Sequence, residues 1–266
     1  MTIHRSRIAA QLWTVRDHCR DAAALAASLQ RIRAIGYEAV QISGVGPIPP
    51  AEIRRLCASE GLAICATHED SRLICDSPQA VVDRLGELGT DATAYPFPHL
   101  PLTTLAEVET LAGQLDRAGA VLRRAGMTLC YHNHHHEFVR VAGRSALEWI
   151  YALTAPANLQ GEPDTYWVQT GGGDPAAWCR RLAGRMPLLH LKDYAIVKPG
   201  REPEVAMSAI GAGSLDWTAI LSAATAAGCR WYIVEQDICP GDPFACLRQS
   251  WDYLVAHHAS AGAPCT

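Results

Sequence analysis

The segment Tyr131–Phe138 contains an unusual concentration of side chains that can do chemistry. It reads Tyr-His-Asn-His-His-His-Glu-Phe, with four imidazoles, one amide and one carboxylate. Imidazole and carboxylate groups bind divalent metals, and imidazole also transfers protons near neutral pH. The segment follows a short apolar run, Met127–Cys130, so these side chains are predicted to lie where a strand ends.

The composition indicates a globular chain and excludes several classes of function. Of the 266 residues, 49% are hydrophobic and 19% are charged, so a large core can form and disorder is not expected. The net charge of −4 without a Lys/Arg run argues against a nucleic-acid partner, and no apolar stretch is long enough to span a membrane. No apolar run follows Met1–Arg7, so we expect no secretory signal, a cytoplasmic location and ten reduced cysteines.

Short apolar runs alternate with amphipathic stretches about eight times along the chain. The expected strands are Ile8–Trp13, Ala39–Ile42, Ala63–Thr67, Ala92–Tyr95, Met127–His132, Leu159–Asp164, Leu188–Leu191 and Trp231–Glu235. The expected helices are Asp21–Ile35, Pro50–Ser59, Pro78–Leu88, Leu105–Arg124, Ala146–Leu153, Pro175–Leu182, Trp217–Ala227 and Pro243–His258. Eight such units predict an α/β fold, a (β/α)8 TIM barrel forming a single domain over residues 1–266. An open doubly wound sheet is the alternative, but it usually has a Gly-rich turn after the first strand, which Gln11–Arg16 lacks.

The active site of such a barrel lies at the carboxyl ends of its strands. The polar and aromatic residues found there, in chain order, are Gln11, Trp13, Gln41, Ser43, His68, Glu69, Tyr95, Phe97, His132, Asn133, His134, Glu137, Asp164, His190 and Glu235. The last four strands each place a carboxylate or an imidazole on this rim, as a divalent metal with mixed oxygen and nitrogen ligands requires. Mg²⁺, Mn²⁺, Co²⁺ and Zn²⁺ all fit, and the ligand types leave the choice open.

Six segments together carry a family resemblance that covers the chain from Gln11 to about Tyr253. They are Tyr131–His134 with Glu137–Phe138, Asp164–Val168, Gly172–Pro175, Leu189–Asp193, Gly211–Trp217 and Tyr232–Asp237. The chain resembles the sugar phosphate isomerase/epimerase family with its xylose isomerase-like TIM barrel, to which tagatose 3-epimerase and inosose dehydratase are related. These segments are specific for a branch of the family and much less specific for a substrate.

The resemblance implies one divalent metal held by a Glu, an Asp, a His and a second Glu. The matching positions are Glu137, Asp164, His190 and Glu235. In the epimerase branch the first Glu ends its strand, whereas His132 stands at that place here, so His132 or His134 is the alternative ligand to Glu137. Relatives also often carry an acidic residue where this chain has Ala209, which weakens the transfer of a precise substrate.

The chemistry implied by the resemblance is proton abstraction next to a carbonyl of a sugar or polyol, through an enediolate that the metal stabilises. The residues expected to take part in catalysis are Glu137, Glu235, His132, His134 and Lys192, and those expected to contact the substrate are Trp13, His68, Phe97 and Trp167. An isomerase or epimerase is the leading hypothesis, and a dehydratase or lyase acting on a keto-inositol or 3-keto-glycoside is the alternative. A sugar-binding module and an endonuclease IV-type nuclease are less consistent with the ligand set and the acidic charge. A homo-oligomer is possible.

Overall fold

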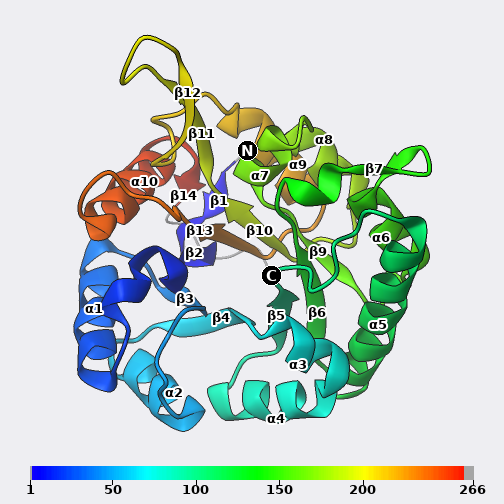
Figure 1. Cartoon of the computed structure of the whole chain (residues 1–266). Coiled ribbons are helices and arrows are strands. Elements are labelled where there is room, and N and C mark those ends of the chain that lie inside the picture. The colour runs from blue at the N-terminus through cyan, green and yellow to red at the C-terminus, as the bar shows by residue number, and fades with distance from the viewer. Residues whose placement is uncertain (1, 261–266) are drawn as a thin grey trace.

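The computed structural model describes residues 2–260, and its centre is a ring of eight parallel strands (Figure 1). The strands are β2 (Ile8–Gln11), β3 (Ala39–Ile42), β4 (Ala63–His68), β5 (Ala92–Tyr95), β6 (Thr128–His132), β9 (Gln160–Glu162), β10 (Leu188–Leu191) and β13 (Trp231–Val234). They pair in the order β10-β13-β2-β3-β4-β5-β6-β9, and an isolated parallel bridge between Asp164 and His190 connects the two ends of the sheet. The predicted TIM barrel is therefore confirmed.

Helices surround the ring and connect its strands (Figure 1). They are α1 (Ala22–Ile35), α2 (Pro50–Ser59), α3 (Ser71–Asp76), α4 (Pro78–Leu88), α5 (Leu105–Arg124), α6 (Ala146–Leu153), α7 (Thr165–Thr170), α8 (Pro175–Arg181), α9 (Trp217–Ala226) and α10 (Pro243–His257). The eight predicted helices are present with bounds that differ by at most one residue, and the short α3 and α7 were not predicted. Within residues 2–260, no helix has the length and apolarity that crossing a bilayer requires.

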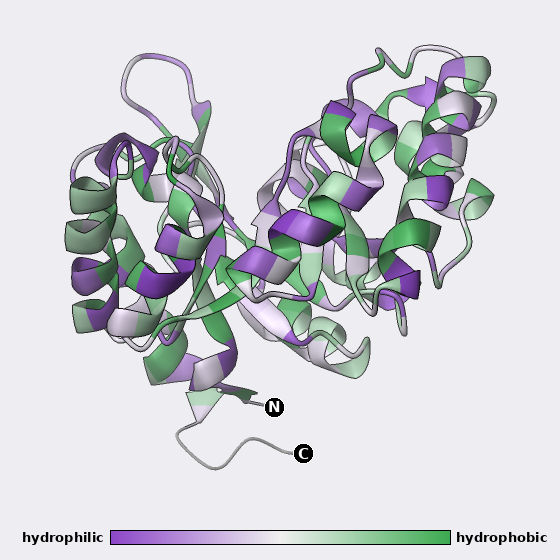
Figure 2. Ribbon diagram, turned by 90° about the horizontal axis from the view of Figure 1, so that it is seen from below, coloured by the Kyte–Doolittle hydropathy of each residue, from purple (hydrophilic) through white to green (hydrophobic). Residues whose placement is uncertain are grey.

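Short strand pairs and 3-10 helices lie outside the eight-stranded sheet. They are the strand pairs β1 (Ile3–His4) with β14 (Ala259–Ser260), β7 (Arg140–Val141) with β8 (Arg144–Ser145) and β11 (Asp193–Val197) with β12 (Glu204–Ser208), and the 3-10 helices η1 (Arg5–Arg7), η2 (Leu12–His18) and η3 (His136–Phe138). The antiparallel pair β11–β12 projects away from the barrel in both views (Figures 1 and 2). This hairpin was not predicted from the sequence.

Local sequence signals explain where the helices start. The longest helix, α5, begins with a capping box in which Thr104 accepts a hydrogen bond from the Glu107 amide and Glu107 accepts one from the Thr104 amide. Ser145 and Glu148 form the same arrangement at α6. Proline occupies the first turn of α2, α4, α8 and α10, where its missing N–H has no helical partner to lose. These signals set the helix boundaries that position the strand ends.

The core has two parts. The larger cluster lies between the sheet and the helices, and Figure 2 shows that the helices carry both apolar and hydrophilic residues, as helices with one buried face do. The smaller cluster contains mainly small side chains from the strands: Ala9, Ala39, Cys65, Ala66, Ala92, Ala94, Cys130, Leu188 and Ile233. Small residues fill the space between the strands in this cluster. At the carboxyl ends of the strands the side chains are polar instead.

The packing of α5 gives a first testable prediction. Gly119 is buried on this helix, and a Cβ added there would lie 1.8 Å from the carbonyl oxygen of Asn158. Because backbone atoms cannot yield as a flexible side chain can, we expect Gly119→Ala to lower the free energy of unfolding by about 3 kcal/mol in urea denaturation. Gly113→Ala on the same helix is the control, since the nearest atom is the flexible Arg117 guanidinium at 3.4 Å. Gly113→Ala should be neutral or stabilise by up to about 1 kcal/mol; equal effects at the two positions would contradict the argument.

Candidate active site

The pairing of β6, β9 and β10 brings the polar residues of three strands together. His132 lies opposite Glu162 in the β6–β9 ladder, and Asp164 forms the bridge to His190. Asp164 also caps α7, because its Oδ1 accepts a hydrogen bond from the Trp167 amide at 2.9 Å. The cap uses one carboxylate oxygen, which leaves Oδ2 available for the site.

Four side chains form a group that could hold a metal ion. Ligand atoms of His132, Asp164, His190 and Glu235 all lie within 4.8 Å of one another, and all four residues are buried. Asp164 Oδ2 and His132 Nδ1 are buried atoms without a hydrogen bond. Two carboxylates and two imidazoles suit Mn²⁺, Co²⁺ or Zn²⁺ better than Mg²⁺, which prefers oxygen ligands. Asp164 Oδ2 has the Lys192 ammonium as an ion-pair partner at 3.1 Å, and the chemistry of the donor set fits a divalent cation.

Lys192 places a positive charge beside this group. Its Nζ lies 2.7 Å from Glu235 Oε2, 3.1 Å from Asp164 Oδ2 and 3.0 Å from Asp237 Oδ2. Burial alone would lower the pKa of Lys192, but the three carboxylates outweigh burial and raise it. Burial raises the pKa of Asp164 to about 6 against the opposing effects of Lys192 and His190. The ammonium thus stays charged and compensates for carboxylates that would otherwise be buried without a partner.

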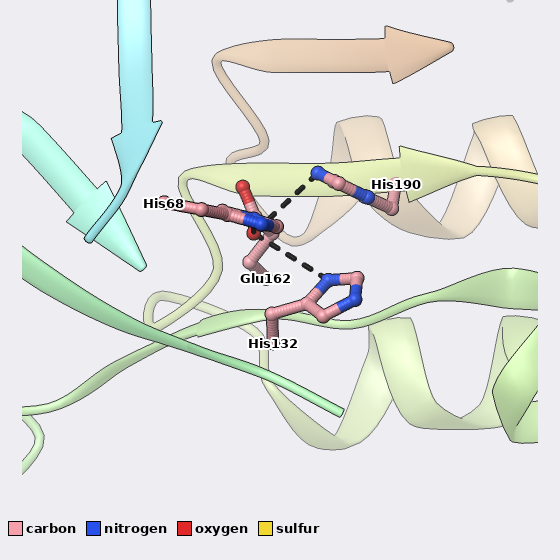
Figure 3. A group of neighbouring side chains, drawn as sticks. All are labelled: His68, His132, Glu162 and His190. Atoms are coloured by element: carbon pink, nitrogen blue, oxygen red, sulfur yellow. Dashed lines mark hydrogen bonds and ion pairs between the residues drawn. The ribbon is translucent and has the colours of Figure 1, made fainter. Parts of the chain in front are cut away.

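A second polar group lies on the inner side of the barrel around Glu162 (Figure 3). Glu162 Oε2 lies 2.7 Å from His68 Nε2, 3.5 Å from His132 Nδ1 and 3.5 Å from His190 Nε2. Burial alone would raise the pKa of Glu162, but His190 and His68 lower it to about 2. The pKa of His190 is raised to about 10, because Glu162 and Glu235 together outweigh its burial. Glu162 is therefore an ionised carboxylate shared by three imidazoles.

Two buried amides fix the orientation of His190. Gln41 donates its Nε2–H to Glu162 Oε1 at 2.7 Å, and its Oε1 accepts from Gln11 Nε2 at 2.8 Å. His190 Nε2 lies 2.6 Å from the same Gln41 oxygen, so this ring nitrogen donates. The opposite nitrogen, Nδ1, then points to Glu235 Oε2 at 2.9 Å. A hydrogen bond that fixes one ring nitrogen leaves the other available as a ligand, as is common for metal-binding histidines.

Glu137 is placed apart from the other predicted ligands. Its Oε1 accepts a hydrogen bond from the Tyr131 hydroxyl and its Oε2 accepts one from the His134 amide. Strand β6 ends at His132, and the following turn folds Glu137 back towards Tyr131. The structure therefore places Asp164, His190 and Glu235 in one group, and the fourth residue of that group is His132, the alternative to Glu137 that the sequence left open. Burial raises the pKa of Glu137 to about 7.

A cavity of about 370 Å³ opens above these groups. It is lined by Trp13, Ser43, His68, Glu69, Asp70, Pro96, Phe97, His132, His134, Lys192, Glu235 and Asp237. Three of the four residues predicted to contact a substrate, Trp13, His68 and Phe97, are in this lining. Trp167 is outside it, and its ring packs on those of His134 and His135. Burial lowers the pKa of His134 to about 2, so this imidazole is neutral.

Sequence reasoning missed Glu162 and Asp237 as site residues. Each lies two positions from a predicted ligand, Asp164 or Glu235. Alternate residues of a strand point to the same face, so a period of two could have indicated both. The neighbouring residues gave no further signal, because a buried carboxylate is recognised only by the partners that the fold supplies.

The profile of the family described as "Xylose isomerase-like TIM barrel" matches residues 29–254. The chain belongs to this family. The family resemblance inferred from the sequence is thus confirmed, and the relatives named below include an inosose dehydratase and a sugar phosphate isomerase/epimerase.

Three relatives illustrate the range of the family. The inosose dehydratase of Lacticaseibacillus casei is 28% identical over 174 residues, which cover 60% of this chain and 58% of that protein. The chain thus matches less than two thirds of the length of this curated relative. The rhizopine catabolism protein MocC of Rhizobium meliloti is 24% identical over 273 residues, covering 88% of this chain and 82% of MocC. A solved sugar phosphate isomerase/epimerase from Parabacteroides distasonis has a TM-score of 0.80 at 21% identity, covering 96% of this chain and 95% of the other, and shows the shared fold.

Proposed function

We propose that this protein is a divalent-metal-dependent enzyme that removes a proton next to a carbonyl group of a keto-sugar or keto-polyol. The observation that carries the proposal is the convergence of Glu235, Lys192 and His68 on one cavity, directly beside the buried group of His132, Asp164 and His190. Clustered titratable groups with strongly shifted pKa values are typical of active sites. The named dehydratase and isomerase/epimerase relatives support the same first chemical step.

His132, Asp164, His190 and Glu235 would hold the metal ion. When bound, such an ion acts as a Lewis acid that stabilises negative charge on the substrate's carbonyl oxygen. Gln41 keeps His190 oriented for this role through the hydrogen bond to Nε2. His132 is suited to ligation because burial lowers its pKa well below the usual range and keeps the imidazole neutral.

Glu235 is the proposed base. Burial alone would raise its pKa, but Lys192 and His190 lower it, so the carboxylate is ionised and able to accept a proton. The Lys192 ammonium lies beside it and can donate a hydrogen bond to a substrate oxygen that gains negative charge. Trp13 and Phe97 are partly exposed, at 40% and 55%, and offer apolar faces to the C–H groups of a sugar ring.

Elimination of water fits the geometry better than epimerisation does. Epimerisation by two opposed glutamates would require Glu137 as the partner of Glu235, but the Glu137 carboxylate is buried and does not line the cavity. His68 does line it, and Glu162 holds its imidazole at 2.7 Å. In the proposed step Glu235 takes the proton next to the carbonyl, His68 protonates the hydroxyl on the neighbouring carbon, and that hydroxyl leaves as water while a C=C bond forms.

Isomerisation or epimerisation is the second candidate, because it shares the first step. The observation in its favour is that Glu235 follows β13 and His68 ends β4, two strands that are separated by β2 and β3 in the sheet. A proton taken on one side of the cavity could therefore be returned from another. The two outcomes differ only in whether a hydroxyl group departs.

The test is NMR in D₂O with a panel of ketoses and keto-inositols. The protein would be stripped with EDTA and reloaded separately with Mn²⁺, Co²⁺, Zn²⁺ or Mg²⁺. We expect exchange of the proton next to the carbonyl and an unsaturated product with at least one keto-polyol. Exchange with a rearranged sugar and no unsaturated product would assign the isomerase or epimerase outcome instead. An absence of exchange with every metal and substrate would refute both.

A further inference from the structure

The cluster formed by His134, His136 and Glu137 has no part in the proposed reaction. Ligand atoms of the three residues lie within 4.8 Å of one another. None of them belongs to the group of His132, Asp164, His190 and Glu235. The cluster lies in the histidine-rich segment whose residue types alone suggested a metal site.

Both imidazoles of this cluster have a nitrogen without a hydrogen-bond partner. His134 Nδ1 and His136 Nε2 are buried atoms without a hydrogen-bond partner. The two rings are nearly parallel, with an angle of 4° and a centroid distance of 5.4 Å. His136 Nε2 lies 3.5 Å from Glu137 Oε2, which is too long for a good hydrogen bond. Buried polar atoms are rarely left unpaired, so these two nitrogens require an explanation.

The carboxylate of Glu137 is held in place but lacks a full positive charge nearby. Tyr131 and the His134 amide orient its two oxygens, and the residue is fully buried. Among residues 2–260, the one ion-pair contact of Glu137 is with His136, whereas Asp164 and Glu235 share Lys192. An ionised carboxylate buried without a cation is costly. A divalent cation between Glu137 and the two free nitrogens would satisfy all three groups.

We propose that His134, His136 and Glu137 form a second divalent-metal site, with Zn²⁺ as its preferred ion. Two imidazoles and one carboxylate are a ligand set that zinc uses in catalytic sites, where the fourth position is left for water or substrate. His134 also lines the cavity, so the proposed site adjoins the cavity through this residue. The site shares no residue with the first metal group and does not depend on the proposed reaction.

The test compares zinc stoichiometry among matched variants. Protein stripped with EDTA would be dialysed against micromolar Zn²⁺ and analysed by mass spectrometry of the metal, and Co²⁺ would be added in parallel to record its visible absorption. We expect two equivalents in the wild type, one in His136→Gln and one in Glu235→Gln. The control is His135→Gln, which removes the neighbouring imidazole outside the cluster and should retain two equivalents. Circular dichroism and thermal melting would verify that each variant is folded.

The outcomes separate the two sites. One equivalent in the wild type that is retained in His136→Gln and lost in Glu235→Gln would overturn the second site and leave the first intact. One equivalent that is lost in His136→Gln but retained in Glu235→Gln would support the second site and count against the first. Two equivalents in His136→Gln, an equal loss in His135→Gln, or no zinc in the wild type would each overturn the second site. If His136→Gln does not fold, Glu137→Gln gives the same comparison from the carboxylate side.

Discussion

Glu235→Gln is expected to reduce kcat/KM by about 10² to 10⁴-fold while leaving the fold intact. The amide keeps the size of the side chain but cannot accept the substrate's proton, and it weakens one of the four contacts proposed for the metal ion. The measurement is the rate of deuterium incorporation and product formation, with the substrate identified in the NMR panel and saturating Mn²⁺ or Co²⁺. Because saturating metal keeps the metal site filled, a remaining loss of activity reports the loss of the base and not the loss of the ion.

Glu148→Gln is the matched control for this experiment. Glu148 is a surface carboxylate that caps α6 and pairs with Arg181, and it lies outside the cavity. Its variant should therefore keep the wild-type rate. A Glu235→Gln protein that retains more than half of the wild-type activity would show that the base lies elsewhere and that the proposed site is misassigned.

Glu162→Gln is expected to lower the free energy of unfolding by about 3 kcal/mol at pH 7 in metal-free protein. The pKa of Glu162 is lowered to about 2 from an ordinary 4.5, so its contribution is fully present above pH 4.5 and is lost as the pH falls towards 2. The loss of unfolding free energy caused by the substitution should therefore be smaller at pH 3.5 than at pH 7, by roughly 1 kcal/mol. Urea denaturation of both proteins in EDTA at pH 7 and pH 3.5 measures this difference. A penalty that is independent of pH would contradict the ionised state of Glu162.

Glu137→Gln provides a control in which the pH dependence of the free energy of unfolding is expected to have the opposite sign. Its pKa is raised to about 7, so the folded protein favours the protonated carboxyl, and this contribution is present below pH 4.5 and lost as the pH rises through 7. The glutamine of the variant does not titrate, so this pH-dependent contribution to stability is absent from the variant. Its stability relative to the wild type should therefore rise by about 3 kcal/mol between pH 4.5 and pH 8, again in metal-free protein. Two carboxylates in one barrel would thus show opposite pH dependences, because Glu162 lies beside the His190 imidazolium and Glu137 has no such partner.

Most of the barrel could be predicted because the helix-stop signals and the apolar strand segments indicate the same element boundaries. The strand Ala39–Ile42 follows a helix that stops at Gly36, where φ is 129° and a Cβ would lie 2.7 Å from the Trp251 ring. The hairpin β11–β12 was missed because Asp193 follows β10 after a single residue, so the sequence shows no turn signal between them. Helix α7 was missed because it has only six residues, too few for a helical pattern to be visible.

The site could be predicted only in part. Asp164, His190 and Glu235 come directly at or after strand ends, and the fold alone brings such residues together. Glu137 was assigned to the same group because the family resemblance implies a Glu ligand shortly after the His-Asn-His segment. The path of the chain after β6 decides its position, and a turn of a few residues cannot be traced from composition. Glu162 was not singled out because its partners His68 and His190 are 94 and 28 residues away along the chain.

The closure of the barrel has a consequence for how the protein holds an ion. Neighbouring strands elsewhere in the ring share ladders of two to four residue pairs, whereas β9 and β10 are linked by the single bridge of Asp164 and His190, with the His190 amide donating to Pro163. This seam is therefore the place where the sheet separates most easily through local opening. Because two of the proposed ligands are the residues that close it, opening of the seam would separate these ligands, and a bound ion would stabilise the closed ring by mass action.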